Sequence, residues 1–246
     1  MGAQAGRQAR QRVGIRGVLS AAMRAGKRSW RRILPVAVAV SLITAVVEIV
    51  VEEYVDGANI SLSVLGDISA SGVSLLGAVF LSGFTCRLLG EEHDGENAGT
   101  SVLAVLRTLP WARLVGADLL VSFIAVLTLV LLVIPGLAAI NFLGLTGSVI
   151  EMEDQRVIAA MRRSAHLVRG HFWTVALLVT LPVALAGEID AAAPEPDSWP
   201  GVLANLGIRG LAEAVAEAVI ALILVSLCHR LIELDRQRAG AGAAAQ

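Results

Sequence analysis

Long apolar runs alternate with short polar segments along the whole chain. Six of these runs match or approach the length of a bilayer-spanning helix. The predicted spans are 33–51, 68–86, 114–133, 137–150, 172–187 and 211–232. Two further segments, 100–109 and 154–169, repeat apolar residues with the period of an amphipathic helix. The predicted fold class is therefore all-α, a polytopic membrane protein with six transmembrane helices and interfacial amphipathic helices.

The longest apolar run, Leu114–Ile150, contains one charge, Asp118, and is too long for a single span. Pro135 and Gly136 lie inside it. We predict a hairpin, with 114–133 as its first arm, a turn at 134–136, and 137–150 as its return arm. At helical rise the return arm covers only about 21 Å. The return arm could therefore cross a locally thinned bilayer completely, or it could be partly re-entrant, and both alternatives stay open.

Basic residues indicate the orientation of these spans. Residues 1–32 carry nine Lys or Arg and no acid, and we predict that they form a cytoplasmic arm. With six crossings, every Lys and Arg except Arg209 falls on the side of this arm, as the positive-inside rule requires. Both termini and both amphipathic helices are therefore predicted to be cytoplasmic. The low-complexity tail, 233–246, is predicted to be disordered.

The composition excludes an ordinary soluble domain. Apolar residues make up 56% of the chain and charged residues 17%, with a mean hydropathy of +0.72, whereas soluble domains are about 25% charged. Arginine greatly outnumbers lysine, and alanine and glycine are abundant, which is typical of a GC-rich bacterial genome. The predicted location is the bacterial inner (plasma) membrane.

Basic side chains on two cytoplasmic segments are predicted to contact anionic lipid headgroups. On the second amphipathic helix, Asp154 is the predicted cap, and the apolar stripe is Val157, Ile158, Met161, Ala165 and Val168. The predicted headgroup contacts are Arg24, Lys27 and Arg28 on the arm, and Arg156, Arg162, Arg163, His166 and Arg169 on the helix. The arm could instead bind nucleic acid, but an apolar span follows at once, so we predict no nucleic-acid partner.

Four carboxylates fall in or near the predicted spans, where a charge is costly and marks a functional hypothesis. They are Glu48, Asp118, Glu213 and Glu217. Their polar neighbours share a helix face with them, which predicts that they point into the bundle. One interpretation is polar packing, with Arg209 near the glutamates and Asp118 within reach of His229 or Arg230. The alternative is a path for protons or cations.

The sequence contains no motif for catalysis or for a cofactor. The acidic loop residues 91–96 are consecutive and flanked by glycine, which favours a solvated loop over a metal site. Cys86 and Cys228 are predicted to be small apolar residues without a disulfide. Small residues at every fourth position from Gly66 to Ser82 predict a close helix–helix contact. We therefore expect no enzyme activity, no metal and no cofactor.

The region from Ile134 onward carries a distinctive pattern. An Ile-Pro-Gly corner, an apolar segment and a glutamate precede the motif A-x-x-R-S-x-x-L-V-R-G-x-F-W. The residues concerned are Ile134, Pro135, Gly136, Glu151, Ala160, Arg163, Ser164, Leu167, Val168, Arg169, Gly170, Phe172 and Trp173. The pattern resembles the glycerophosphodiester-phosphodiesterase membrane-domain family and the related YciC-like uncharacterised inner-membrane proteins. The resemblance implies a membrane fold. It does not imply phosphodiesterase activity, because a short tail follows the sixth predicted span.

Two functions follow as hypotheses. The first is a non-catalytic membrane module that interacts with anionic lipid or with a partner, either another membrane protein or a second copy of the chain. The alternative is a transporter coupled to protons or cations through the carboxylates in the spans.

Overall fold

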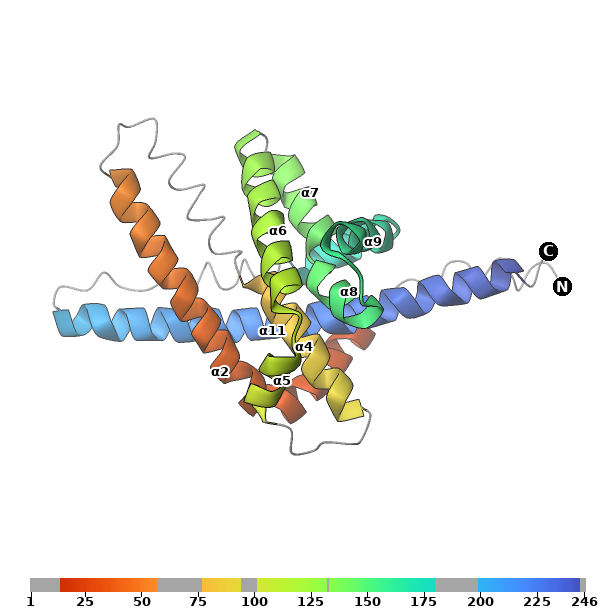
Figure 1. The fold of residues 1–246 in the computed structure, drawn as a ribbon, viewed down its shortest axis with the longest axis horizontal. Helices are drawn as coiled ribbons and strands as arrows, with labels where there is room; N and C mark the ends of the chain where they lie inside the picture. Colours follow the sequence, from red (N-terminus) through yellow and green to blue (C-terminus); the bar gives the residue numbers. More distant parts are fainter. Residues whose placement is uncertain (1–13, 57–76, 94–100, 132, 180–198, 244–246) are drawn as a thin grey trace.

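The computed structural model describes residues 14–56, 77–93, 101–131, 133–179 and 199–243, and all their regular elements are helices (Figure 1). The predicted all-α class is confirmed for this part of the chain. The elements are α2 (Ile15–Asp56), α4 (Ala78–His93), α5 (Val102–Thr108), α6 (Trp111–Leu131), α7 (Val133–Leu143), α8 (Thr146–Glu153), α9 (Val157–Arg169) and α11 (Trp199–Ala243). Residues 172–179 are also helical.

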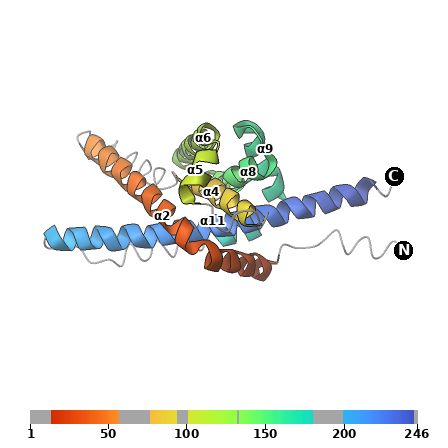
Figure 2. The same cartoon turned by 60° about the horizontal axis from the view of Figure 1, so that its bottom comes forward.

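Two long helices, α2 and α11, pack against each other and support the shorter helices. The described part of the predicted arm, from Ile15 onward, and the first span form one continuous helix, α2, although Pro35 lies inside it. A proline inside a helix removes one backbone hydrogen bond, and α2 changes direction along its length (Figure 2). Likewise α11 extends far beyond the predicted sixth span at both ends.

Two described helical segments, Ile15–Val46 and Gly210–Gly240, are long and apolar enough to cross a bilayer. A third qualifies if Val102–Thr108 and Trp111–Ala125, which meet at 80°, form one bent span. The bend has a local cause, because Pro110 forces the preceding Leu109 into an extended conformation. These helices are compatible with a membrane protein. The predicted segments 68–76 and 180–187 lie outside the described residues.

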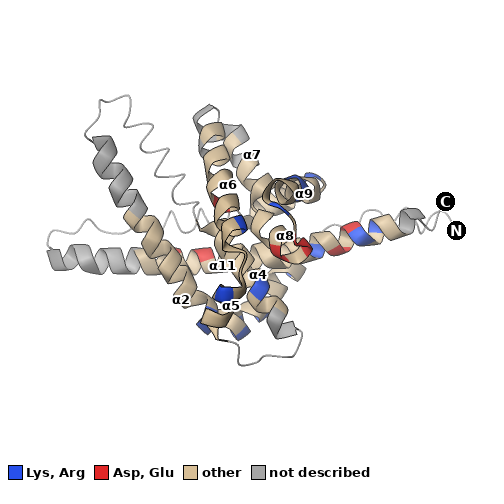
Figure 3. Ribbon diagram, in the orientation of Figure 1, with Lys and Arg blue, Asp and Glu red and all other residues tan. Residues whose placement is uncertain are grey.

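The side chains of α6 are arranged with the apolar face outward. Every fourth residue of one face is an exposed apolar side chain: Trp111, Val115, Leu119, Phe123 and Leu127. The buried face instead carries Asp118 and Ser122. Figure 3 shows α7 and most of α6 without charged residues. A soluble helix normally has the opposite arrangement, so this face of α6 is suited to contact lipid.

The predicted hairpin is present, but its turn and its return arm differ from the prediction. Residues 134–136, the predicted turn, lie inside α7, which begins at Val133. The chain turns between α6 and α7, which pack together, and Pro135 lies in the first turn of α7, a position that tolerates proline. The return arm then ends at Leu143, and α8 begins at Thr146. The predicted single segment 137–150 is therefore two short helices. At helical rise α7 measures about 16 Å.

The short helix α8 is enclosed by several other helices. Its residues 146–150 are buried, and it contacts α4, α6, α9 and α11. Gly147 makes the approach to α4 possible, because a Cβ atom there would collide with the Val79 carbonyl oxygen and the Ser82 hydroxyl. Ser82 belongs to the predicted stripe of small residues. The stripe members before Gly77 lie outside the described residues.

Two boundaries, at α9 and at the end of α11, differ from the prediction. Asp154 does not cap α9; it follows α8 in the left-handed conformation, with φ +45°, and α9 begins after Arg156. Asp tolerates this conformation better than most residues. The described part of the predicted disordered tail, 233–243, is helical as the end of α11. Within this part, Asp235 forms ion pairs with Arg163 and His166 of α9, which the sequence does not reveal.

The close approach at Gly147 gives the first testable prediction. Gly147→Ala should destabilise the fold by about 1–3 kcal/mol, the range for overpacking a core. Gly116→Ala is the control, because no neighbouring atom lies within 4 Å of a Cβ there, and alanine favours a helix by up to about 1 kcal/mol over glycine. Thermal unfolding in detergent measures both. Equal melting temperatures for the two variants would contradict the packing argument.

Candidate functional site

The end of α8 carries acids that bind arginines from three other helices. The pairs are Glu151 with Arg87 of α4 (4.0 Å), Glu153 with Arg163 of α9 (3.1 Å) and Asp154 with Arg113 of α6 (2.6 Å). We call residues 151–154 the acidic corner. The Arg113 pair is exposed and contributes about 0–1 kcal/mol. The other two pairs are less accessible and therefore matter more for the fold.

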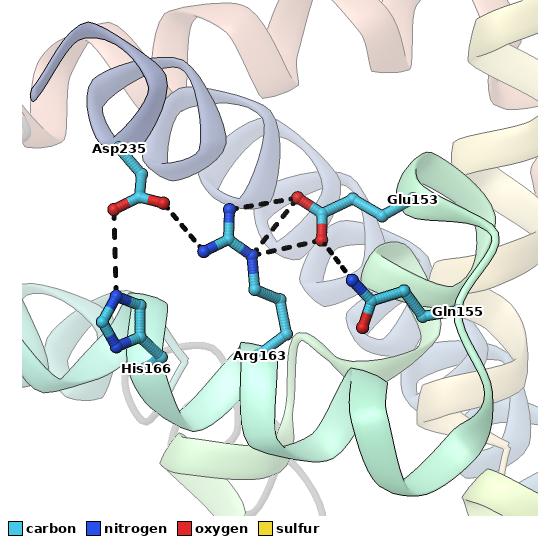
Figure 4. A network of polar contacts seen from close by, with 5 residues as sticks. All are labelled: Glu153, Gln155, Arg163, His166 and Asp235. Atoms are coloured by element: carbon cyan, nitrogen blue, oxygen red, sulfur yellow. Dashed lines mark hydrogen bonds and ion pairs between the residues drawn. The ribbon is translucent and has the colours of Figure 1, made fainter. Parts of the chain in front are cut away.

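Arg163 is the centre of a network that joins α8, α9 and α11 (Figure 4). Its Nε donates to both carboxylate oxygens of Glu153, and its Nη1 donates to Asp235 at 2.7 Å. Gln155 donates to Glu153, and His166 Nε2 lies 3.9 Å from Asp235. Partial burial alone lowers the pKa of the Arg163 guanidinium, but the two carboxylates outweigh this effect and raise its pKa overall. Arg163 therefore stays charged and is a structural residue.

Glu151 is the most enclosed acid of the corner, with 4% of its side chain exposed. Burial raises the pKa of its carboxyl group, and the Arg87 guanidinium opposes this shift. Its Oε1 atom has no hydrogen-bond partner within the described part of the chain. Nearby, the Cys86 thiol lies 3.9 Å from the Ser148 carbonyl oxygen. Cys86 and Cys228 are both buried free thiols.

The apolar face of α9, which was predicted to lie in the membrane interface, packs against other helices of the protein. Met161 and Val168 of the predicted apolar stripe are buried, together with Ala160, Ser164 and Leu167. Ile158 is the exception and is exposed. Apolar periodicity identifies a face to be covered, but it does not distinguish lipid from another helix. Four of the predicted headgroup residues of this region remain exposed: Arg156, Arg162, His166 and Arg169.

The predicted headgroup residues of the arm lie elsewhere. Arg24, Lys27 and Arg28 are exposed on α2. Lys27 borders an apolar groove of about 320 Å³ between α2 and the stretch of α11 from Val219 to Ile223. Arg169 instead lies beside the later part of α11. Lys27 and Arg169 therefore lie beside different stretches of α11.

The carboxylates of the predicted spans are held by polar groups of other helices. Asp118 accepts hydrogen bonds from the backbone N–H groups of Gly77 and Val79 at the start of α4. It therefore satisfies two N–H groups that have no partner within α4. This pairing replaces the expected one with His229 or Arg230. Arg230 instead pairs with Glu233 at 2.6 Å.

The hydroxyl group of Ser41 donates to Glu217 Oε2 at 3.1 Å, which links α2 to α11. Glu217 is buried, and its Oε1 atom has no hydrogen-bond partner within the described residues. Glu213 is partly exposed one turn earlier. The side chains of Glu48 and Arg209 lie outside the described part, so their predicted roles stay predictions.

Several of the residues that carry the family resemblance have structural roles here. Ala160, Leu167 and Val168 are buried, and the hydroxyl group of Ser164 donates to the Phe142 carbonyl oxygen at 2.6 Å. That bond satisfies a carbonyl group at the end of α7. Trp173 is 83% exposed and has no structural role of this kind. In the described residues, no group of three or more His, Cys, Asp or Glu is placed to hold a metal ion.

Sequence reasoning assigned Arg163 to lipid and missed its partner Asp235, which lies 72 residues away. It also did not single out Arg238, whose Nη2 lies 3.4 Å from His171 Nε2. The only sequence signal was the mixture of charges after residue 229, which does not identify partners.

No protein-family model, curated protein or solved structure matches this chain.

The Arg163 network gives the second prediction. Arg163→Gln should lower the free energy of unfolding by about 2 kcal/mol, less than the roughly 3–5 kcal/mol of a fully buried pair, because 23% of the Arg163 side chain is exposed. The exposed neighbour Arg162→Gln should change it by less than about 0.5 kcal/mol. Unfolding in detergent mixtures measures both values. If Arg162→Gln were the more damaging, the network would not hold α9.

Proposed function

We propose that this protein is a non-catalytic membrane module whose cytoplasmic surface binds anionic lipid headgroups. One observation carries the proposal: exposed arginines and large exposed apolar side chains occur together on and beside α9. Arg156, Arg162 and Arg169 make no ion pair within the described part of the chain. Ile158 is 62% exposed and Trp173 is 83% exposed. Such a surface matches the boundary between acyl chains and anionic headgroups.

The proposal includes a multi-pass arrangement in the bacterial inner membrane. We propose six crossings with both termini in the cytoplasm, with α6 and α7 as the arms of one hairpin. The distribution of basic residues supports this orientation, and the apolar face of α6 supports contact with lipid. Membership of the glycerophosphodiester-phosphodiesterase membrane-domain or YciC-like group is part of the same proposal. A partner protein or a second copy would bind the same exposed surface.

The lipid proposal is tested with the double variant Arg156→Gln/Arg162→Gln in nanodiscs that contain phosphatidylglycerol and phosphatidylcholine. Spin-labelled lipids report the preference of the protein for the anionic lipid. Each basic residue near a surface contributes about 1 kcal/mol, so we expect the preference to fall at least about fivefold. The matched double variant with lysine at both positions keeps the charge and should keep the preference. An unchanged preference in the glutamine variant would refute the proposal.

Proton- or cation-coupled transport is the second candidate, and Glu217 favours it. This carboxylate is buried on α11, keeps one oxygen without a partner in the described residues, and lies near Ser41 of α2. A carboxylate that is not fully bonded within a bundle has an oxygen available for a proton or cation. Asp118 is a weaker candidate, because its carboxylate already accepts two backbone hydrogen bonds.

Transport is tested with Glu217→Gln in proteoliposomes that contain a pH-sensitive dye. If Glu217 carries protons, the proton flux of the variant should be at least about tenfold lower than that of the wild type. Its melting temperature should stay near that of the wild type. Ser41→Ala is the companion variant, because it removes the hydroxyl donor and leaves the carboxylate. Absence of proton flux in the wild type, or full flux in Glu217→Gln, would eliminate this candidate.

A further inference from the structure

A groove of about 310 Å³ lies between the C-terminal end of α9, the turn after it and the last part of α11. Its polar side contains Arg169, His171 and Arg238. Arg169 and Arg238 are exposed, and Arg238 Nη2 lies 3.4 Å from His171 Nε2. Burial, and then the charge of Arg238, lower the pKa of His171. A neutral imidazole can accept a hydrogen bond from Arg238 and orient its guanidinium, which keeps further N–H donors for a ligand.

The same groove also has an apolar side. Leu167 of α9 lines it together with Leu231 and Leu234 of α11. These leucines belong to the hydrophobic core, so the apolar side of the groove is continuous with the interior of the protein. They are only 2–5% exposed, so they form an apolar floor of the groove. A ligand with an anionic group and an adjoining apolar segment matches this combination of a charged rim and an apolar floor.

The charges of the groove favour an anion. Asp235 is the one acid among the residues that line it, and Arg163 binds that carboxylate at 2.7 Å. Arg169 and Arg238 therefore give the groove a positive charge. A phosphodiester is anionic and matches it. Arginine is also well suited to phosphate, since its guanidinium can donate two parallel hydrogen bonds.

We propose that this groove binds one anionic phospholipid, with Arg169 and Arg238 on the phosphodiester and an acyl chain along the three leucines. The inference rests on the proposed function and deepens it. Arg156 and Arg162, on the exposed surface, attract many anionic lipids weakly. The groove holds a single molecule more tightly, because it combines charge with apolar contact.

The test is a titration of the full-length protein in mild detergent with dioleoylphosphatidylglycerol, followed by native mass spectrometry. The wild type should bind one molecule at least about tenfold more tightly than any further ones. Arg238→Gln should weaken this first binding step about tenfold, and Arg238→Lys should weaken it less. Arg169→Gln, from the α9 side of the groove, is the second variant and should weaken it similarly. Melting temperatures identify any variant that fails to fold.

Three controls test whether binding requires the groove residues, the anionic headgroup and the acyl chains. Arg156→Gln/Arg162→Gln should leave the first binding step unchanged, because neither residue lines the groove. Dioleoylphosphatidylcholine and the water-soluble headgroup glycerophosphoglycerol should each bind at least about tenfold more weakly than phosphatidylglycerol. Equal binding of the soluble headgroup would mean that the site recognises a free phosphodiester, which overturns the lipid assignment.

The outcomes separate this inference from the proposed function. Wild-type binding by both Arg238→Gln and Arg169→Gln would overturn the groove assignment, and a loss in Arg156→Gln/Arg162→Gln alone would place the tight site on the exposed surface. In that second case the proposed function stands while the groove assignment fails. If the wild type does not prefer phosphatidylglycerol over phosphatidylcholine in either experiment, both proposals fail.

Discussion

The ion pair between Arg163 and the carboxylates of Glu153 and Asp235 is the interaction on which the packing of α8, α9 and the end of α11 depends. It joins the buried helix α8, the amphipathic helix α9 and the end of α11 through one guanidinium group. Its geometry satisfies both acids, and removing the arginine would leave two partly buried negative charges close together. The position of α9, and with it the exposed arginines and the groove, follows from this contact.

The packing of α2, α4, α6 and α11 follows a different physical rule, because polar groups buried between these helices need partners from neighbouring helices. Asp118 accepts from two N–H groups at the start of α4, and Ser41 donates to Glu217 across α2 and α11. Apolar side chains occupy the outer face of α6 instead. The Arg163 network and this packing meet at α8, where Gly147 permits close backbone contact with α4. A short, buried helix with a charged end can take part in both.

Part of the candidate site was predictable and part was not. The exposed arginines Arg156, Arg162 and Arg169 follow from the polar face of an amphipathic helix. The role of Arg163 does not, because a one-dimensional pattern places it beside Arg162 and gives both the same role. Its partners come from segments 10 and 72 residues away. The motif that carries the family resemblance is mostly a packing motif here, since Ala160, Ser164 and Val168 face other helices.

The sequence by itself determined the all-helical class, the hairpin at residues 114–150 and the burial of Asp118 and Glu217. These features depend on local periodicity and on the high free-energy cost of exposing a charge in an apolar environment. Both can be recognised in each segment independently of the others. Only the tertiary structure decided that the return arm is divided into α7 and α8, that the apolar stripe of α9 covers protein, and that the end of α11 is helical. These outcomes depend on contacts between segments that are distant in the sequence. The free energy of such a contact cannot be inferred from the pattern of either segment alone.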